Sequence, residues 1–168
     1  MMDAHRDEIK LYYQRTLIVW EGFCELHKEL FDLTCDEYLT LLASDIDKLE
    51  EMLPLKEEII SKIGELEKDR SALIEELNDS GVFAQPIFKA GDLLTAFADI
   101  EKKSAIPALK NLNSLLIDIV EKIQEQNKKN QVFLNKSLLS LKEIKQGFTG
   151  KKAYTTYGAD GLTRSLNR

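Results

Sequence analysis

Residues 106–146 read IPALKNLNSLLIDIVEKIQEQNKKNQVFLNKSLLSLKEIKQ, and this stretch decides the fold class. Its apolar positions return every three or four residues, a spacing that places them on one face of an α-helix. Pro107 suits a first helical turn, and Gly147 offers a left-handed C-terminal cap. The spacing therefore predicts one long amphipathic helix over residues 106–146. Its seam is Leu109, Leu112, Leu116, Ile119, Ile123, Asn127, Asn130, Leu134, Leu138 and Leu141.

Two more long helices are expected on the N-terminal side of this one. Aromatic and aliphatic residues at steps of three and four predict a helix over residues 3–33. Thr34 and Glu37 match the Thr-x-x-Glu pattern of a capping box, so a second helix is expected over residues 36–78. Its apolar seam is close to a 3.5-residue repeat, which is typical of a coiled coil. Pro54 lies inside this helix and is expected either to kink it or to end it.

Two segments lack a sustained helical pattern. Residues 79–105 contain three Gly or Pro residues and are expected to form a connector with one short helix that starts near Asp92. Residues 147–168 are rich in Gly, Thr and Ser, so a disordered tail is expected there. The sequence thus predicts an all-α fold: an elongated antiparallel bundle or coiled coil of three long helices over residues 1–146, followed by a flexible tail.

The charge and composition exclude several classes of function. The chain has 168 residues and a net charge of -6, with eight glycines and three prolines. Residues 145–168 carry five basic residues and one acidic residue, or +4, which leaves -10 on the first 144 residues. An acidic body disfavours nucleic-acid binding, which needs basic surface against phosphate. No apolar run reaches the roughly 20 residues of a membrane helix, and neither a signal peptide nor a disulfide framework is evident. We expect a cytoplasmic protein that does not insert into membranes.

Catalytic chemistry has little support in this sequence. Cys24 and His27 are spaced to share a metal ion, with Cys35 or His5 as further ligands, but a free Cys on an aromatic stripe is commonly a small core residue. Only two histidines are present, and no Ser/His/Asp or Cys/His nucleophile set can be assembled. We expect no enzymatic activity and no cofactor; a metal-dependent enzyme is the weakest alternative.

The C-terminal half of the last helix has more apolar width than one neighbouring helix covers. A face of this kind fits an amphipathic helix from a partner protein. We expect that face to comprise Phe133, Leu134, Leu138, Leu141 and Ile144. Asn127 and Asn130 interrupt the same stripe, and two explanations stay open for them: they set the register of a buried seam, or they face the partner.

Three motifs resemble the FlgN family of flagellar export chaperones. The first is Asp47-x-Leu49, Lys56-Glu57 and Leu66-Glu67-x-x-Arg70 in the second helix. The second is Asn127-x-x-Asn130 with Leu134, Asn135 and Leu138-x-x-Leu141, and the most specific is Tyr154-x-x-Tyr157-Gly158-Ala159-Asp160-Gly161 after the last helix. The resemblance implies an all-helical chaperone that binds the terminal helical segment of hook-filament junction proteins, FlgK and FlgL, prevents their premature assembly and delivers them to the flagellar export gate.

In this interpretation the tail carries the delivery signal. Tyr157 is an aromatic anchor beside flexible glycines, so we expect Tyr157, Gly158, Asp160 and Gly161 to dock on the export gate. The rival hypothesis is a structural coiled-coil scaffold whose seams are satisfied by self-association. Free monomer and homodimer both stay open, and a scaffold would bury in a stable homo-oligomer the face that a chaperone leaves available.

Overall fold

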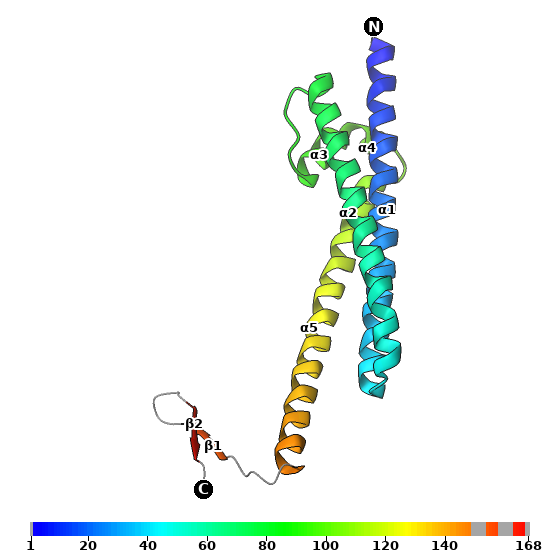
Figure 1. Cartoon of the computed structure of the whole chain (residues 1–168). Helices are drawn as coiled ribbons and strands as arrows, with labels where there is room; N and C mark the ends of the chain where they lie inside the picture. The colour runs from blue at the N-terminus through cyan, green and yellow to red at the C-terminus, as the bar shows by residue number, and fades with distance from the viewer. Residues whose placement is uncertain (1, 149–153, 158–162, 167–168) are drawn as a thin grey trace. The chain divides into compact units, whose positions relative to one another are not determined.

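The computed structural model describes residues 2–148, 154–157 and 163–166 (Figure 1). The chain divides into two compact units, residues 1–128 and 129–168, which are treated separately below. The first unit holds α1 (Met2–Ala43), α2 (Ile46–Ser80), α3 (Ala90–Ala96), α4 (Ala98–Lys103) and the first half of α5 (Ala108–Phe148). The second holds the rest of α5 and the strands β1 (Tyr154–Tyr157) and β2 (Thr163–Leu166).

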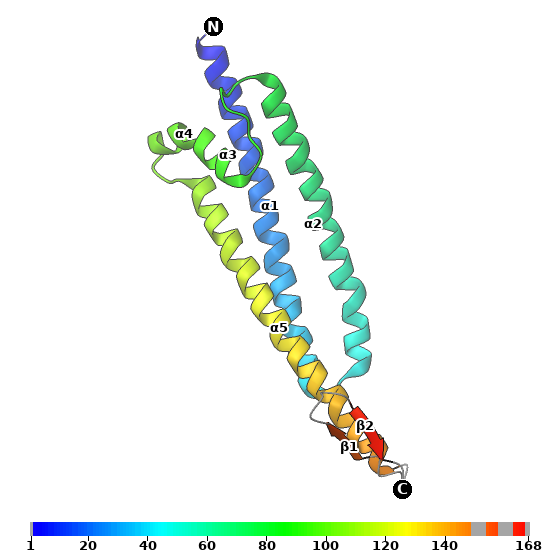
Figure 2. The same cartoon turned by 90° about the vertical axis from the view of Figure 1, so that its left-hand side faces the viewer.

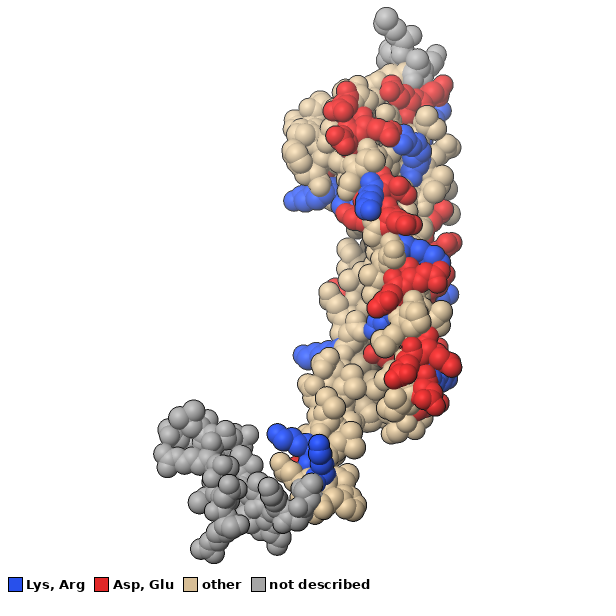
Figure 3. Space-filling model, viewed as in Figure 1, with Lys and Arg blue, Asp and Glu red and all other residues tan. Residues whose placement is uncertain are grey.

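The expected all-α class is confirmed by these helices. Helices α1 and α2 lie side by side and run antiparallel, as both Figure 1 and Figure 2 show. On the face shown in Figure 3, acidic side chains gather in several groups along the helices, with basic ones between them. The finer expectation of a coiled coil stays a prediction.

Two short strands were not expected in the C-terminal segment. They pair antiparallel, with Tyr154 opposite Leu166 and Tyr157 opposite Thr163. Tyr and Thr are enriched in strands, which accounts for the local preference. Residues 149–153, 158–162 and 167–168 lie outside the described residues, so disorder of the whole segment stays a prediction.

The boundary predicted between the first two helices is wrong. Helix α1 continues through Thr34, which is fully buried and whose hydroxyl donates to Leu30 O at 2.6 Å. A Thr side chain can bond the carbonyl one turn earlier, so the Thr-x-x-Glu pattern does not by itself start a helix. Leu41 is also buried, so continuing the helix to Ala43 stabilises it by removing more apolar area from water.

The turn between α1 and α2 instead lies at Ser44 and Asp45. Ser44 adopts the left-handed conformation with φ of 55°, and its N–H donates to Leu41 O at 3.1 Å. The N–H of Asp45 donates to Thr40 O at 3.2 Å, which completes a Schellman motif. The Asp45 side chain then accepts the N–H of Lys48 at 3.0 Å and caps α2. One acidic residue therefore ends one helix and begins the next.

Pro54 does not end α2. The helix runs unbroken from Ile46 to Ser80 and includes Pro54, so the alternative of a break is wrong. It stops at Gly81, whose φ of 64° is the left-handed conformation that glycine tolerates best. The Asn78 side chain then fixes the following loop, because its amide exchanges two hydrogen bonds with the backbone of Ile87, at 2.8 and 2.9 Å.

The connector holds two short helices rather than the one expected. Asp92 accepts the N–H groups of Phe88 and Lys89 at 3.0 and 3.1 Å, and these bonds hold the pKa of its carboxyl below the usual value. Phe97 separates α3 from α4 and is fully buried. Its ring meets Tyr13 edge-on at 5.4 Å and Phe83 at 5.3 Å between centroids.

The buried core of the first unit gathers side chains from α1, α2, α3 and α5, from the loop before α3 and from the junction between α3 and α4. The buried members are Val19, Trp20, Phe23, Leu73, Leu77, Ile87, Leu93, Phe97 and Leu109. Two further contacts tie α1 to α5: Trp20 Nε1 donates to Asn113 Oδ1 at 3.1 Å, and Cys24 Sγ donates to Leu112 O at 3.4 Å. The connector is therefore part of the core and not a loose linker.

Glu101 joins three helices through one carboxylate. It accepts the Tyr13 hydroxyl of α1 at 2.9 Å and the N–H groups of Leu109 and Lys110 at the start of α5, at 2.6 and 3.4 Å. These N–H groups belong to the first helical turn, which has no partner within its own helix. Burial and the adjacent Glu101 raise the pKa of Tyr13 to about 12.

The revised α1–α2 turn can be tested with single substitutions. Asp45→Ala should lower the free energy of unfolding by about 1 kcal/mol, because α2 loses its N-cap. Ser44→Gly should raise it by about 0.5 kcal/mol, because glycine relieves the left-handed strain at some cost in chain entropy. Urea denaturation measures both. Asp45→Asn is the control, since Asn caps about as well as Asp. Equal stability of the Ala and Asn variants would contradict the assignment.

The Tyr13–Glu101 bond predicts a pH-dependent stability. The folded-state pKa of Tyr13 lies above its unfolded value near 10, so the neutral phenol stabilises the fold below pH 10, and this contribution is lost as pH rises towards 12. Tyr13→Phe should cost about 1 kcal/mol at neutral pH, and the difference from wild type should shrink above about pH 10. Denaturation at several pH values measures this. A Tyr12→Phe control should keep the alkaline loss; a pH-independent cost for Tyr13→Phe would refute the prediction.

Candidate functional site

The predicted partner-binding residues share one face of α5. At 100° per residue, the seven positions from Asn127 to Ile144 fall within an arc of about 140°. Phe133 and Leu134 are half-buried. Towards the helix end the large apolar side chains are open: Leu138 and Leu141 are 62% exposed and Ile144 is 55% exposed. The sequence therefore located a face whose second half lies open to solvent.

One further exposed apolar residue belongs to that face. Phe148 is 88% exposed and continues the same face by one turn beyond Ile144. Leu139 is also 59% exposed, but at 100° per residue it lies on nearly the opposite side of the helix. The sequence predicts that the helix ends at Gln146, but it continues to Phe148. We call Leu138, Leu141, Ile144 and Phe148 the distal apolar face.

The two asparagines differ in their surroundings. Asn130 is 2% exposed, whereas Asn127 is exposed. Among the described residues, no buried side-chain nitrogen or oxygen lacks a hydrogen-bond partner. The burial of Asn130 fits the alternative in which it sets packing register, and the exposure of Asn127 fits the alternative in which it meets a partner.

The predicted export-gate residues are only partly described. Tyr157 ends β1 and pairs with Thr163. Gly158, Asp160 and Gly161 lie outside the described residues.

The Cys24–His27 pair makes local contacts. The Cys24 thiol bonds to Leu112 O, and burial raises its pKa. His27 Nδ1 lies 2.7 Å from Phe23 O, one turn earlier in the same helix. Within the described part of the chain, no three His, Cys, Asp or Glu side chains are grouped to hold a metal ion. Both residues are accounted for by packing.

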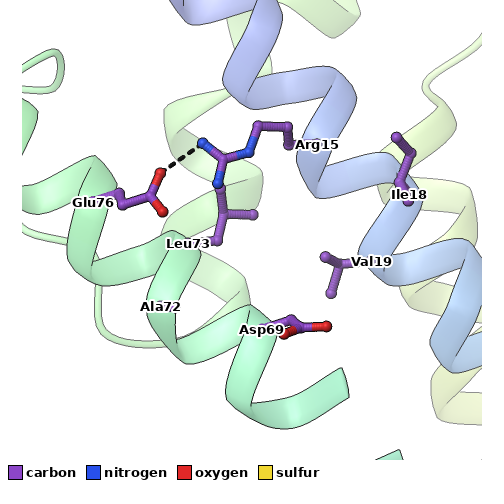
Figure 4. A pocket seen from close by; sticks show the side chains of 7 residues that line it. All are labelled: Arg15, Ile18, Val19, Asp69, Ala72, Leu73 and Glu76. Atoms are coloured by element: carbon purple, nitrogen blue, oxygen red, sulfur yellow. Dashed lines mark hydrogen bonds and ion pairs between the residues drawn. The ribbon is translucent and has the colours of Figure 1, made fainter. Parts of the chain in front are cut away.

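A pocket of about 330 Å³ lies between α1 and α2 (Figure 4). Arg15 Nη1 and Glu76 Oε2 are 2.6 Å apart across it, and Asp69 lies nearby. The hydrogen bond raises the pKa of the Arg15 guanidinium and lowers that of the Glu76 carboxyl. Because the guanidinium is already paired, this pocket offers no open cation to an anionic ligand, and the pair links the two helices at the surface.

One known protein family matches most of the chain. The family model described as FlgN protein matches residues 21–165, which is most of the chain. The chain belongs to the FlgN family. Its members are flagellar export chaperones, so the chain has a general role as a chaperone in flagellum assembly. No curated protein and no solved structure matches the chain.

Family membership also bears on the kind of partner. FlgN chaperones bind flagellar hook-associated proteins. The FlgN match spans α2, the connector, α5 and the motif around Tyr157, and it includes every predicted site residue. Across the described residues, no helix combines the length and apolar character needed to span a membrane.

Proposed function

We propose that this FlgN chaperone binds the terminal helical segment of the hook-filament junction proteins FlgK and FlgL in the cytoplasm and hands them to the export gate. The observation that carries the proposal is the distal apolar face, where four large side chains on one helix face are all at least 55% exposed. Soluble proteins rarely leave such side chains together unless they bind something.

The binding mode is helix against helix. An amphipathic client helix places its apolar stripe along the distal apolar face and extends over Phe133 and Leu134. Such client helices expose apolar stripes that are made to pack in the finished structure, so an unbound client is prone to early association. Covering the stripe delays assembly, and this binding needs no catalytic group or cofactor.

Delivery is assigned to the segment after α5. Tyr157 supplies the aromatic anchor, with Gly158, Asp160 and Gly161 completing the motif. The motif follows the distal apolar face by about ten residues, so the chain offers separate positions for client and gate.

A second candidate function is self-association as a coiled-coil scaffold. Ile46, Leu53 and Ile60 favour it, because they repeat every seven residues along α2 and are 61%, 56% and 52% exposed. A dimer of the free chain in sedimentation equilibrium that Leu53→Lys dissolves would support this alternative.

The client-binding proposal predicts the effect of a charge on the distal apolar face. Leu138→Asp and Leu141→Asp should each weaken binding of the C-terminal helices of FlgK or FlgL at least tenfold, since burying an unpaired carboxylate costs more than 1.4 kcal/mol. Isothermal calorimetry measures the affinity. Both side chains are exposed in the free protein, so the fold should survive.

The matched control is Ile18→Asp, because Ile18 is 66% exposed on α1. This variant should bind the client like wild type, and circular dichroism should show the same helix content in all three. If the α5 variants, still helical, keep wild-type affinity, the client binds elsewhere and the proposal is wrong.

The delivery proposal makes a separate prediction for Tyr157. Tyr157→Ala should leave client affinity unchanged in vitro but reduce client secretion in cells, because an aromatic anchor is worth about 2 kcal/mol or more at an interface centre. Immunoblots of the culture supernatant measure secretion. Tyr154→Ala is a control within the same strand. Weakened client binding by Tyr157→Ala would place the tyrosine in the client site and contradict its assignment to the gate.

A further inference from the structure

A second hollow in the first unit is lined by apolar and basic residues, although the protein as a whole is acidic. It has a volume of about 640 Å³ and lies between the first turns of α1, the loop before α3, and α4. This volume is in the range of sites that bind small molecules or a few peptide side chains. We call it the α1–α4 hollow and define it by three apolar residues (Ile9, Phe83 and Ile100) and three basic residues (Arg6, Lys10 and Lys103).

The apolar part of the hollow is held in place by the core. Ile9, Phe83 and Ile100 are half-buried and pack against the buried cluster, and the Phe83 ring lies edge-on to Phe97. Their positions do not depend on a ligand. Their remaining exposed area lines the hollow and gives an apolar side chain a preformed place to bury itself.

The charged part is basic within an acidic protein. The lining of the hollow holds three basic residues, Arg6, Lys10 and Lys103, and one carboxylate, Asp99, although the first 144 residues carry a net charge of -10. Lys10 contacts Asp7 at 3.3 Å, and Asp99 contacts Lys102 at 3.5 Å. Both of these pairs are more than half exposed and therefore hold their partners weakly. Within the described residues, no ion pair engages Arg6 or Lys103.

Apolar surface beside several cations fits a ligand that carries apolar groups beside carboxylates. Asp99 and Ser104 also line the hollow, and both can accept hydrogen bonds. A fatty acid offers them no N–H or O–H donor once its carboxylate is ionised. A peptide supplies backbone N–H groups along its length. The lining thus favours an acidic peptide over an acidic lipid.

We propose that the α1–α4 hollow binds a short acidic, amphipathic peptide segment of a partner protein, with apolar side chains against Ile9, Phe83 and Ile100 and carboxylates against Arg6, Lys10 and Lys103. This site is distinct from the distal apolar face in both residues and charge. It does not depend on the proposed client-binding function.

The experiment uses the full chain and three labelled hexapeptides. The probe alternates glutamate with leucine or phenylalanine, one comparison peptide has lysine in place of glutamate, and another has serine in place of the apolar residues. Fluorescence anisotropy should show binding of the acidic amphipathic peptide at least tenfold tighter than of either comparison peptide. Raising the salt concentration should weaken it, because exposed charge pairs are screened.

Charge reversal locates the site. Arg6→Glu combined with Lys103→Glu should weaken binding at least tenfold, and both side chains are exposed, so folding should be unaffected. The matched control is Lys48→Glu combined with Lys68→Glu, which makes the same charge change at exposed positions of α2 outside the hollow. The control should stay within about twofold of wild type. Amide shifts on adding peptide should concentrate in residues 6–10, 83 and 96–104, and not in 133–148.

Several outcomes would overturn the proposal. The first is the absence of saturable binding to wild type, and the second is equal binding by the Arg6/Lys103 variant and wild type. Equal binding of the lysine peptide would show that charge does not select the ligand. Saturable binding of dodecanoate in calorimetry, without binding of the peptide, would assign the hollow to a lipid. Shifts confined to α5 would assign the peptide to the distal apolar face.

Discussion

The packing of the first unit depends on the Glu101 carboxylate, which accepts hydrogen bonds at the N-terminal turn of α5. Helix α5 begins after a connector that contains two short helices, and its first N–H groups have no partner inside the helix. Glu101 supplies that partner and accepts the Tyr13 hydroxyl at the same time. The fully buried Phe97, one turn before Glu101, packs against the Tyr13 ring. The start of α5 is thus set by α1 and α4 together. The direct hydrogen bonds of Trp20 and Cys24 to the first half of α5 then fix its direction relative to α1 in this unit.

Local pattern was sufficient to predict the helices but not all of their ends. The seam from Leu109 to Leu141 predicted α5 within two residues at each end, because apolar periodicity persists along the whole helix. The capping box at Thr34 failed because the same residue types also fit a helix interior, and burial of Thr34 and Leu41 decided between them. The boundary between α1 and α2 is instead set by Ser44, which takes the left-handed conformation, and Asp45, which caps α2. Nothing in the sequence linked Glu101 to Tyr13, since 88 residues separate them.

The candidate site also has features that the sequence predicts and features that depend on tertiary packing. The sequence predicted which residues of α5 share a face, because that depends only on helical geometry. It did not predict that Asn130 is buried while Asn127 is exposed, or that Leu138 and Leu141 stay open, because these depend on which neighbours reach the helix. The α1–α4 hollow was not visible in the sequence at all. Its residues come from α1, a loop and α4, and only the fold brings Arg6 and Lys103 to one place.

The exposure gradient along α5 decides which residues supply affinity in the proposed client complex. Binding energy comes from apolar area that is newly removed from water, at about 25 cal/mol per Å². Asn130 is already buried, and Phe133 and Leu134 are half-buried, so they have less area left to contribute than their size suggests. Leu138, Leu141, Ile144 and Phe148 keep most of theirs. Association also costs several kcal/mol in lost motion, so a face of only four open side chains gives a modest net affinity. A modest affinity suits a chaperone that must release its client, and it follows here from the small number of open apolar side chains without a separate mechanism that forces release.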